Sequence, residues 1–554
     1  ATTASNNTAV GYDSLVANTT GAENVALGVS ALAANTTASN NVAVGAFTLD
    51  ANTTGGENTG IGHAVLSTNI TGASNTGVGF TSLLVNTASN NTAVGHNTLK
   101  ANTSGTQNTA VGAGALDANT TAANNSAFGY NALGANTTGA NNVGIGQFSL
   151  DANTTGASNT ALGHNALTAN TTADNNTAVG KGALELSTTG ATNTAIGGAA
   201  MAANTTGSTN VAVGQSALNS NTTASNNVAV GFNALGANTT GANNTAVGRL
   251  ALDACTTGNS NVAIGNGCLT DMTTANNNTA VGDNSCANIT TATGITAMGN
   301  SSLNAQTTGD NNTAIGYLAL VTGTTGASNT AVGKSALGAS TTASSNTALG
   351  FNSGSGVTTG AGNTLLGRDT ATNLTDGNYN VMIGLSTHVS GTGNDNAIGI
   401  GHNFSVDSNN FSFGKASNVV TCDFDADATF TRSSDVNKKT NIKDTDIGLS
   451  FINELKTVTF NWKPNSEFPK NYNDYSETEN HMNTEINMYG MIAQDVEQAL
   501  DKVGHKNFGG WKENSDGSQK LAQGMFIYPL INAVKELSTM VDELKAEITT
   551  LKGE

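Results

Sequence analysis

The chain has 554 residues but only 20 Lys or Arg and 38 Asp or Glu, so 10% of it is charged, against about 25% in an ordinary soluble domain. The net charge of −18 argues against a nucleic-acid binder, because phosphate contacts need clustered Lys and Arg. No apolar run is long enough to predict a membrane-spanning helix, and no basic, apolar leader predicts a secretory signal. The first residue is Ala1 rather than Met, so we expect an upstream segment to be missing.

The charges are unevenly distributed along the chain. Residues 1–432 hold 7 Lys or Arg and 19 Asp or Glu, whereas residues 433–554 hold 13 and 19. All three Pro and both Trp also lie in the second part. The sequence therefore joins two kinds of polypeptide near residue 432, and only the second has an ordinary globular composition.

The first part is a tandem repeat. A marker Gly recurs every 17 residues from Gly11 to Gly384, with one step of 16 between Gly79 and Gly95, which makes 23 units. The consensus is N-T-A-V-G-x-x-A-L-x-A-N-T-T-G-A-x, with an apolar residue before every marker Gly and mostly Leu four residues after it. A fixed period with two apolar columns predicts a solenoid rather than a disordered low-complexity tract.

Each unit reads as one closed coil. The segment N-T-A-V-G predicts a short strand and a turn, and N-T-T-G predicts a second polar strand or a corner. Stacked coils would pair as parallel strands about 4.8 Å apart, so 23 coils predict a rod on the order of 110 Å long. We expect the small Ala and the branched Val or Ile to fill a thin interior.

Asn stands four residues before the Gly in 22 of the 23 units, and Ile295 is the exception. Stacked Asn side chains can hydrogen-bond to the coils above and below, and this ladder is favoured over glycosylation or a ligand-binding face. The residue directly after the Gly is chemically mixed, which predicts an outward-facing column, and an ordinary exposed surface is favoured there over a binding stripe. We expect no metal site, because His63, His96 and His164 are several coils apart, and we expect buried free thiols at Cys255, Cys268 and Cys286.

The core "N-x-A-[IV]-G" of each unit resembles the β-roll heads of trimeric autotransporter adhesins and the repeat shafts of phage tail fibres. The adhesin head has a shorter coil, so the similarity is architectural. The resemblance implies a left-handed parallel roll with three chains side by side. We predict the rod over residues 1–386 and a β-rich neck over residues 387–432.

Residues 433–554 resemble the endosialidase-type intramolecular chaperone at the C-terminus of phage tail spikes and fibres. The opening Ser-Asp followed by Lys is matched by Ser434, Asp435 and Lys439, while Asn437 stands where the family usually has Arg. The block "G-[ML]-I-A-Q-[DE]-V" is matched from Gly490 to Val496, including Gln494 and Asp495. The resemblance implies an α+β domain that directs assembly and then cleaves itself.

The chemistry of the motif is that of a Ser-Lys dyad. A Ser hydroxyl is a poor nucleophile until a base takes its proton, and a Lys is such a base when burial lowers its pKa. The scissile carbonyl would precede the nucleophile, so the predicted cut lies between Ser433 and Ser434, and tethering keeps this substrate at high effective molarity. The alternative is that Ser434 caps a turn and Lys439 is a surface charge. We expect no cofactor.

The C-terminus predicts a helix over residues 524–552 with an apolar heptad seam: Leu530, Val534, Leu537, Val541, Leu544, Ile548 and Leu551. The seam is compatible with dimers, and a trimer is implied only by the family resemblance. Three helices joined there would align three chains before the slow β pairing of the rod begins.

The leading hypothesis is a homotrimeric adhesive fibre, most simply a phage tail fibre on the virion that contacts a host-surface receptor such as a glycan. A bacterial surface adhesin or extracellular filament is the alternative. A polysaccharide-degrading solenoid needs paired carboxylates, whereas Asp50, Asp117, Asp151 and Asp253 share a column several coils apart. An ice-binding solenoid would use the stacked Thr pairs. None of these hypotheses requires membrane insertion.

Overall fold

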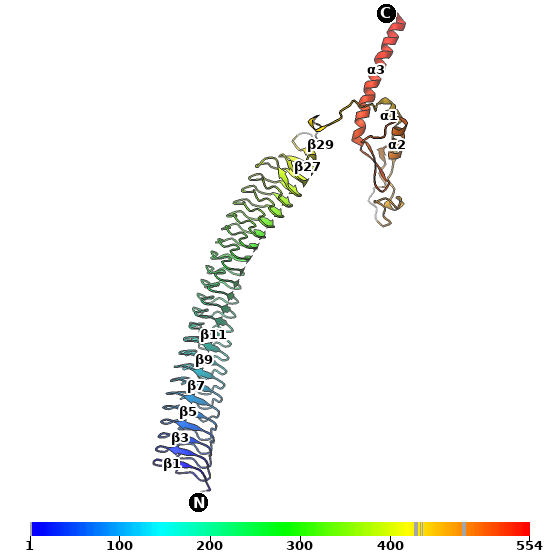
Figure 1. The fold of residues 1–554 in the computed structure, drawn as a ribbon. Helices are drawn as coiled ribbons and strands as arrows, with labels where there is room; N and C mark the ends of the chain where they lie inside the picture. Colours follow the sequence, from blue (N-terminus) through cyan, green and yellow to red (C-terminus); the bar gives the residue numbers. More distant parts are fainter. Residues whose placement is uncertain (1–2, 426–429, 433, 435, 479–483, 554) are drawn as a thin grey trace. The chain divides into compact units, whose positions relative to one another are not determined.

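A computed structural model describes the chain except for residues 1–2, 426–429, 433, 435, 479–483 and 554 (Figure 1). The chain divides into two compact units, Ala1–Ser433 and Ser434–Glu554. Among the residues described, no helix is both long and apolar enough to cross a membrane.

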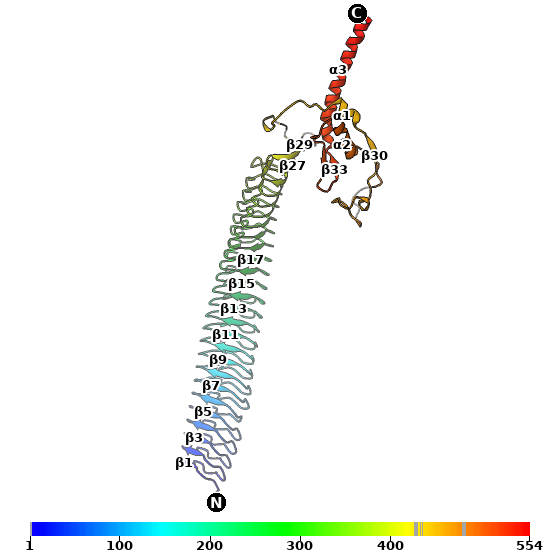
Figure 2. The ribbon, with the colours of Figure 1, turned by 45° about the vertical axis from the view of Figure 1, so that its right-hand side comes forward.

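The first unit is a parallel β-solenoid in which each coil contributes one strand of three residues. Successive strands pair in register, so that Thr160, Ala161 and Leu162 lie beside the corresponding residues of the next coil. The coils stack one above the next along the rod (Figures 1 and 2). The N-T-T-G segment forms a corner rather than a second strand.

Twenty-three strands share this geometry, each ending directly before a marker Gly. They are β1 (Thr8–Val10), β2 (Val25–Leu27), β3 (Val42–Val44), β4 (Thr59–Ile61), β5 (Thr76–Val78), β6 (Thr92–Val94), β7 (Thr109–Val111), β8 (Ser126–Phe128), β9 (Val143–Ile145), β10 (Thr160–Leu162), β11 (Thr177–Val179), β12 (Thr194–Ile196), β13 (Val211–Val213), β14 (Val228–Val230), β15 (Thr245–Val247), β16 (Val262–Ile264), β17 (Thr279–Val281), β18 (Thr296–Met298), β19 (Thr313–Ile315), β20 (Thr330–Val332), β21 (Thr347–Leu349), β22 (Thr364–Leu366) and β23 (Val381–Ile383).

The solenoid continues for one coil beyond the predicted end of the period. Strand β25 (Ile398–His402) pairs in parallel with β23, and β26 (Phe404–Val406) pairs in parallel with β24 (Thr387–Val389). The prediction that the repeat ends at residue 386 was therefore wrong by one coil. In this coil Gly399, Ile400 and Gly401 replace the usual A-V-G, so the repeat is hard to recognise in the sequence. The backbone nevertheless retains the parallel strand pairing of the other coils.

An antiparallel ribbon follows this last coil. Strand β27 (Asn410–Lys415) pairs in parallel with β25, then β28 (Asn418–Asp423) pairs antiparallel with β27, and β29 (Phe430–Arg432) with β28. The strands predicted for the neck are thus present. The ribbon occupies the edge that another parallel coil would otherwise extend.

The interior of the solenoid differs from the expectation in one respect. The Ala in the middle of each strand and the Leu after the marker Gly are buried, as Ala161 and Leu167 show. The Val, Ile or Leu before the Gly faces outward instead, and Leu162 is 44% exposed. The expectation that these branched side chains fill the interior was wrong, because neighbouring residues of a strand point to opposite faces and the Ala takes the inner one.

The coil closes through residues with left-handed backbone. Leu167 has a φ of 54° and its counterparts in most coils are similar, although this conformation costs about 1–2 kcal/mol for a residue with a side chain. Full burial of the Leu side chain, worth about 1.5–3 kcal/mol, offsets that cost. The marker Gly has no such compensation: at Gly163, with a φ of 142°, a Cβ would lie 2.6 Å from the carbonyl oxygen of Gly180.

The Asn column before the strands forms the predicted ladder inside the solenoid. Asn24 Oδ1 accepts hydrogen bonds from the backbone N–H of Asn41 at 2.9 Å and from Asn41 Nδ2 at 3.1 Å. A second ladder was not predicted: in the N-T-T-G corner, Asn35 Nδ2 donates to Asn18 Oδ1 at 2.9 Å and Asn52 Nδ2 to Asn35 Oδ1 at 3.2 Å. These buried amides are engaged by protein groups, which speaks against their glycosylation.

The second unit is a small α/β arrangement that ends in a long helix. Its elements are η1 (Val436–Lys438), α1 (Leu449–Glu454), β30 (Val458–Phe460), η2 (Asn465–Glu467), β31 (Met488–Gly490), α2 (Ala493–Lys502), β32 (Trp511–Glu513), β33 (Gln519–Leu521), η3 (Gln523–Phe526) and α3 (Ile527–Lys552). Strands β30 and β31 form one antiparallel pair, and β32 and β33 form another.

A compact aromatic core holds this unit together. Phe451 of α1 is fully buried, and its ring lies 5.6 Å from that of Phe508 and 6.2 Å from that of Phe526. Val496 and Leu500 of α2 pack into the same cluster. The core thus joins α1, α2 and the turn that leads into α3.

Candidate functional site: a Ser-Lys pair at the boundary between the two units

The predicted dyad is brought together in the structure. Lys439 Nζ donates a hydrogen bond to Ser434 Oγ over 2.6 Å. The single turn of η1 between the two residues reverses the chain so that they meet, and Lys439 N–H closes this turn on the carbonyl oxygen of Val436 at 3.1 Å. The geometry places a possible base within reach of the hydroxyl proton.

Both residues belong to the second unit, and Ser434 is its first residue, because the division between the units falls between Ser433 and Ser434. Both Ser434 and Lys439 are exposed to solvent. Ser433, on the other side of the predicted scissile bond, and Asp435 of the family motif lie outside the described residues. The roles of all four residues stay predictions.

The second family motif lies elsewhere in the same unit. Gly490 ends β31, and a Cβ on it would lie 3.2 Å from Cε1 of Phe460 on the paired strand. Gln494 and Asp495 stand in the first turn of α2, where a carboxylate favours the positive end of the helix dipole. Val496 fills the aromatic core. The motif residues therefore contribute to the strand pair, the start of α2 and the core of the second unit. Among the described residues, no hydrogen bond joins the motif to the dyad.

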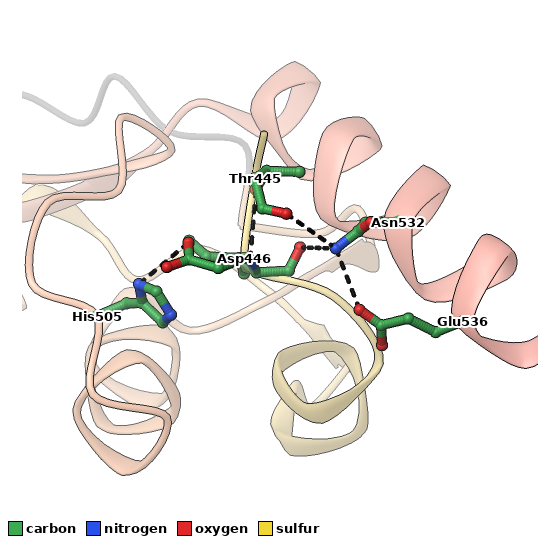
Figure 3. Close-up of polar contacts among 6 residues, drawn as sticks. Thr445, Asp446, His505, Asn532 and Glu536 are labelled. Carbon is green, nitrogen blue, oxygen red and sulfur yellow. Dashed lines mark hydrogen bonds and ion pairs between the residues drawn. The ribbon is translucent and has the colours of Figure 1, made fainter. Parts of the chain in front are cut away.

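A polar clamp fastens the segment after the dyad to the C-terminal helix (Figure 3). Asn532 Nδ2 donates to the carbonyl oxygens of Thr445 and Ile447, each at 3.3 Å, and to Glu536 Oε1 at 3.1 Å. On the other side of the segment, His505 Nδ1 lies 3.8 Å from Asp446 Oδ1. The sequence analysis missed this clamp because its partners are separated by up to 87 residues and match no motif.

The apolar seam of α3 lies largely in water. The predicted helix is observed as η3 and α3, and every seam residue from Leu530 to Leu551 is exposed. The inner side of the first turns is covered by the unit itself through Pro529 and Ala533. This helix of 26 residues therefore carries a row of exposed apolar side chains along most of its length.

The remaining candidates in the rod have little of the character of an active site. Asp117 and Lys100 line one surface pocket of the rod. Asp117 is the only carboxylate in the lining of this pocket, whereas glycoside hydrolysis uses two. Partial burial raises the pKa of the carboxyls of Asp117, Asp151 and Asp253. Burial also raises the pKa of the Cys255 thiol to about 11, so the thiolate needed for reactivity is scarce.

A known family model matches part of the second unit. Residues 434–505 match the family model described as chaperone of endosialidase. The match begins at Ser434, the first residue of the second compact unit, and covers a part of the chain that excludes the solenoid. Neither a curated protein nor a solved structure gives a match to the chain.

Proposed function

We propose that this protein is a trimeric tail fibre for attachment to a host cell surface, and that its C-terminal unit directs assembly and then cuts itself off between Ser433 and Ser434. The observation that carries the proposal is the 2.6 Å contact between Lys439 Nζ and Ser434 Oγ at the boundary between the two units. A cut there would separate the solenoid and its terminal ribbon from the unit that follows.

The proposed reaction is an acyl shift followed by hydrolysis. Lys439, in its neutral form, accepts the proton of the Ser434 hydroxyl as Oγ attacks the carbonyl carbon of Ser433. The Ser433–Ser434 peptide bond breaks, the Ser434 nitrogen takes the proton from Lys439, and an ester to Oγ remains. Water then hydrolyses the ester, leaving a carboxylate on Ser433 and a free amine on Ser434.

The exposure of the dyad supports a link between cleavage and assembly. A Lys serves as a base only after losing its proton, and burial is the main physical route to that state. In the single chain, Ser434 and Lys439 are both exposed. We therefore propose that neighbouring chains cover the dyad, so that the cut follows assembly.

Two apolar surfaces support assembly from several copies. One is the seam of α3. The other, which we call the outer stripe, comprises the apolar residues that precede the marker Gly in every coil; among them Ile61, Leu162, Met298 and Leu349 are exposed. Monomeric proteins rarely expose a continuous apolar surface of this length. Another copy of the chain carries the same spacing of coils and therefore fits the stripe along its whole length.

The self-cleavage is tested with the full chain and denaturing gels. Wild-type protein should yield two fragments, with Ser434 at the N-terminus of the smaller one. Ser434→Ala should abolish the cut without loss of folding, and Lys439→Ala should do the same. Lys439→Arg should be nearly as damaging, because Arg keeps its proton at physiological pH.

Lys438→Ala serves as the control and should still cleave. Assembly is measured separately, from the mass of the native particle in light scattering. Unchanged cleavage in Ser434→Ala, or a fragment that begins at another residue, would contradict the assignment of Ser434 and Lys439 as the catalytic dyad. A wild-type particle with the mass of one chain would contradict the proposed trimeric assembly.

A further inference from the structure

Four exposed side chains form a row near the C-terminal end of the solenoid. Tyr317, Lys334, Phe351 and Arg368 each follow the marker Gly of consecutive coils, so an aromatic residue alternates with a cation. Lys334 Nζ lies 5.8 Å from the ring centroid of Tyr317 and 5.6 Å from that of Phe351, and Arg368 Cζ lies 5.7 Å from the centroid of Phe351. We call these four residues the aromatic-cation row.

The row concentrates positive charge on an acidic rod. It holds two of the seven Lys or Arg in residues 1–432, a part of the chain with 19 acids. Arg368 is paired with Asp369 at 3.0 Å, but Lys334 makes no ion pair within the described part of the chain. Tyr317 is 49% exposed and Phe351 40%. An uncompensated cation thus stands between two accessible aromatic rings.

The row is unsuited to the contact between chains that the outer stripe provides. The stripe is apolar in every coil, whereas the column that contains the row carries Lys181, Arg249 and Asp283 in other coils. Charges in a dry interface are costly unless each is paired. The column therefore faces solvent, and the row stays accessible when the chains associate.

The backbone carbonyl oxygens along the row are already occupied, so a ligand is recognised mainly by side chains. The carbonyl oxygens of Tyr317, Lys334 and Phe351 already accept hydrogen bonds from the next coil, at 3.0, 3.0 and 2.8 Å. An extended peptide that adds a strand needs free backbone groups and is disfavoured. The exposed part of each aromatic side chain suits an apolar surface of a ligand, and the cation beside it suits an anionic group on the same ligand.

We propose that the aromatic-cation row binds an acidic carbohydrate. The C–H face of one sugar ring packs on Tyr317 or Phe351, and its carboxylate or sulfate pairs with Lys334. Successive coils are about 4.8 Å apart, so the two aromatic platforms lie about 10 Å apart along the rod and can engage separate sugars of one chain. The biological role of this site rests on the proposed attachment function, whereas the binding itself does not.

The test uses the full-length protein and titration calorimetry with three probes: an oligogalacturonide with carboxylates, a heparin-derived oligosaccharide with sulfates, and a neutral galactan oligosaccharide. We expect one or both acidic probes to bind, the neutral one to bind at least about tenfold more weakly, and added salt to weaken binding. The two acidic probes distinguish the carboxylate from the sulfate.

Lys334→Gln and Phe351→Ala should each weaken the binding of the acidic probe at least about tenfold. Lys181→Gln and Phe232→Ala, from the same column in distant coils, are the matched controls and should bind as wild type. Absence of binding by both acidic probes at millimolar concentration would overturn the proposal, as would equal losses in the controls. Tighter binding of oligothymidylate or an acidic peptide would also overturn it. Assembly and cleavage of the same variants, measured on gels and by light scattering, keep failure of this site distinct from failure of the proposed fibre function.

Discussion

Glu536 of the C-terminal helix accepts a hydrogen bond from the backbone N–H of Leu449, with 2.7 Å between Oε2 and the nitrogen. The two residues are 87 positions apart in the sequence. Leu449 is the first residue of α1, whose preceding residue Gly448 has no side chain to cap the helix. The helix that carries the apolar seam therefore also caps the helix that follows the dyad.

Replacing Glu536 should loosen this connection. Glu536→Ala leaves a partly buried N–H of α1 without its acceptor, and we expect a loss of about 1–2 kcal/mol in the stability of the C-terminal unit. Hydrogen exchange at the amides of α1 should become faster. Glu543→Ala, at an exposed position of the same helix, is the control. Equal exchange rates in the two variants would contradict the capping role.

The seam of α3 should control association rather than the fold of one chain. Leu544 is 55% exposed, so Leu544→Lys removes little that the single chain buries. We expect this charge to reduce the assembled fraction strongly, since core positions of a helical bundle exclude unpaired Lys. Light scattering measures the particle mass. Glu547→Lys, at an exposed position outside the seam, should assemble normally. Normal assembly of both variants would exclude the seam as the surface that drives association.

The marker Gly should tolerate no side chain. Gly163→Ala places a Cβ 2.6 Å from the carbonyl oxygen of Gly180 and forces a φ of 142° on Ala. We expect local destabilisation of at least about 1–3 kcal/mol, detected as faster hydrogen exchange in the coils around residue 163. Gly198→Ala is a close control, because its Cβ would meet nothing within 4 Å. Similar effects at both positions would show that close packing of the coils is not the cause.

The last coils should become less stable in acid. Burial lowers the pKa of His388, with a smaller opposing effect from Asp369, and His388 Nδ1 has no hydrogen-bond partner among the described residues. A His with a lowered pKa binds its proton more weakly in the folded than in the unfolded chain. Stability is thus greatest above its unfolded pKa and falls as the pH drops through that value. Exchange around β24 at pH 7 and pH 5 measures the effect.

His388→Gln should remove this part of the pH dependence. The substitution keeps a polar side chain of similar reach but cannot take up a proton. An unchanged difference between pH 7 and pH 5 in this variant would assign the effect to another group.

Much of the solenoid was predictable from its columns, including the 17-residue coil, the parallel pairing and the first Asn ladder. The outward direction of Val44 was not recognised, although it follows from the ladder: if Asn41 points inward, then Ala43 does too, and Val42 and Val44 point outward. Apolar character alone suggested the interior, but Val44 belongs to the outer stripe.

The candidate site shows a similar division. Ser434 and Lys439 were identified from a local motif, and five residues of separation allow one turn to bring them together. Asn532 and Glu536 could not be identified, because their partners are backbone groups that only the tertiary fold brings near α3. Hydrogen bonds to backbone atoms impose no residue type on the partner and so leave no pattern in the sequence.

The one coil of 16 residues shows how this rod can change over evolutionary time. Thr76 still pairs with Thr92, and the missing residue is absorbed at the corner, where Asn86 Nδ2 reaches the carbonyl of Ala88, two residues on, in place of the usual three. A corner that absorbs such a change leaves the strands of later coils in place. Unequal recombination between near-identical coils would then lengthen or shorten the rod in steps of about 4.8 Å without altering the sequence of the C-terminal unit.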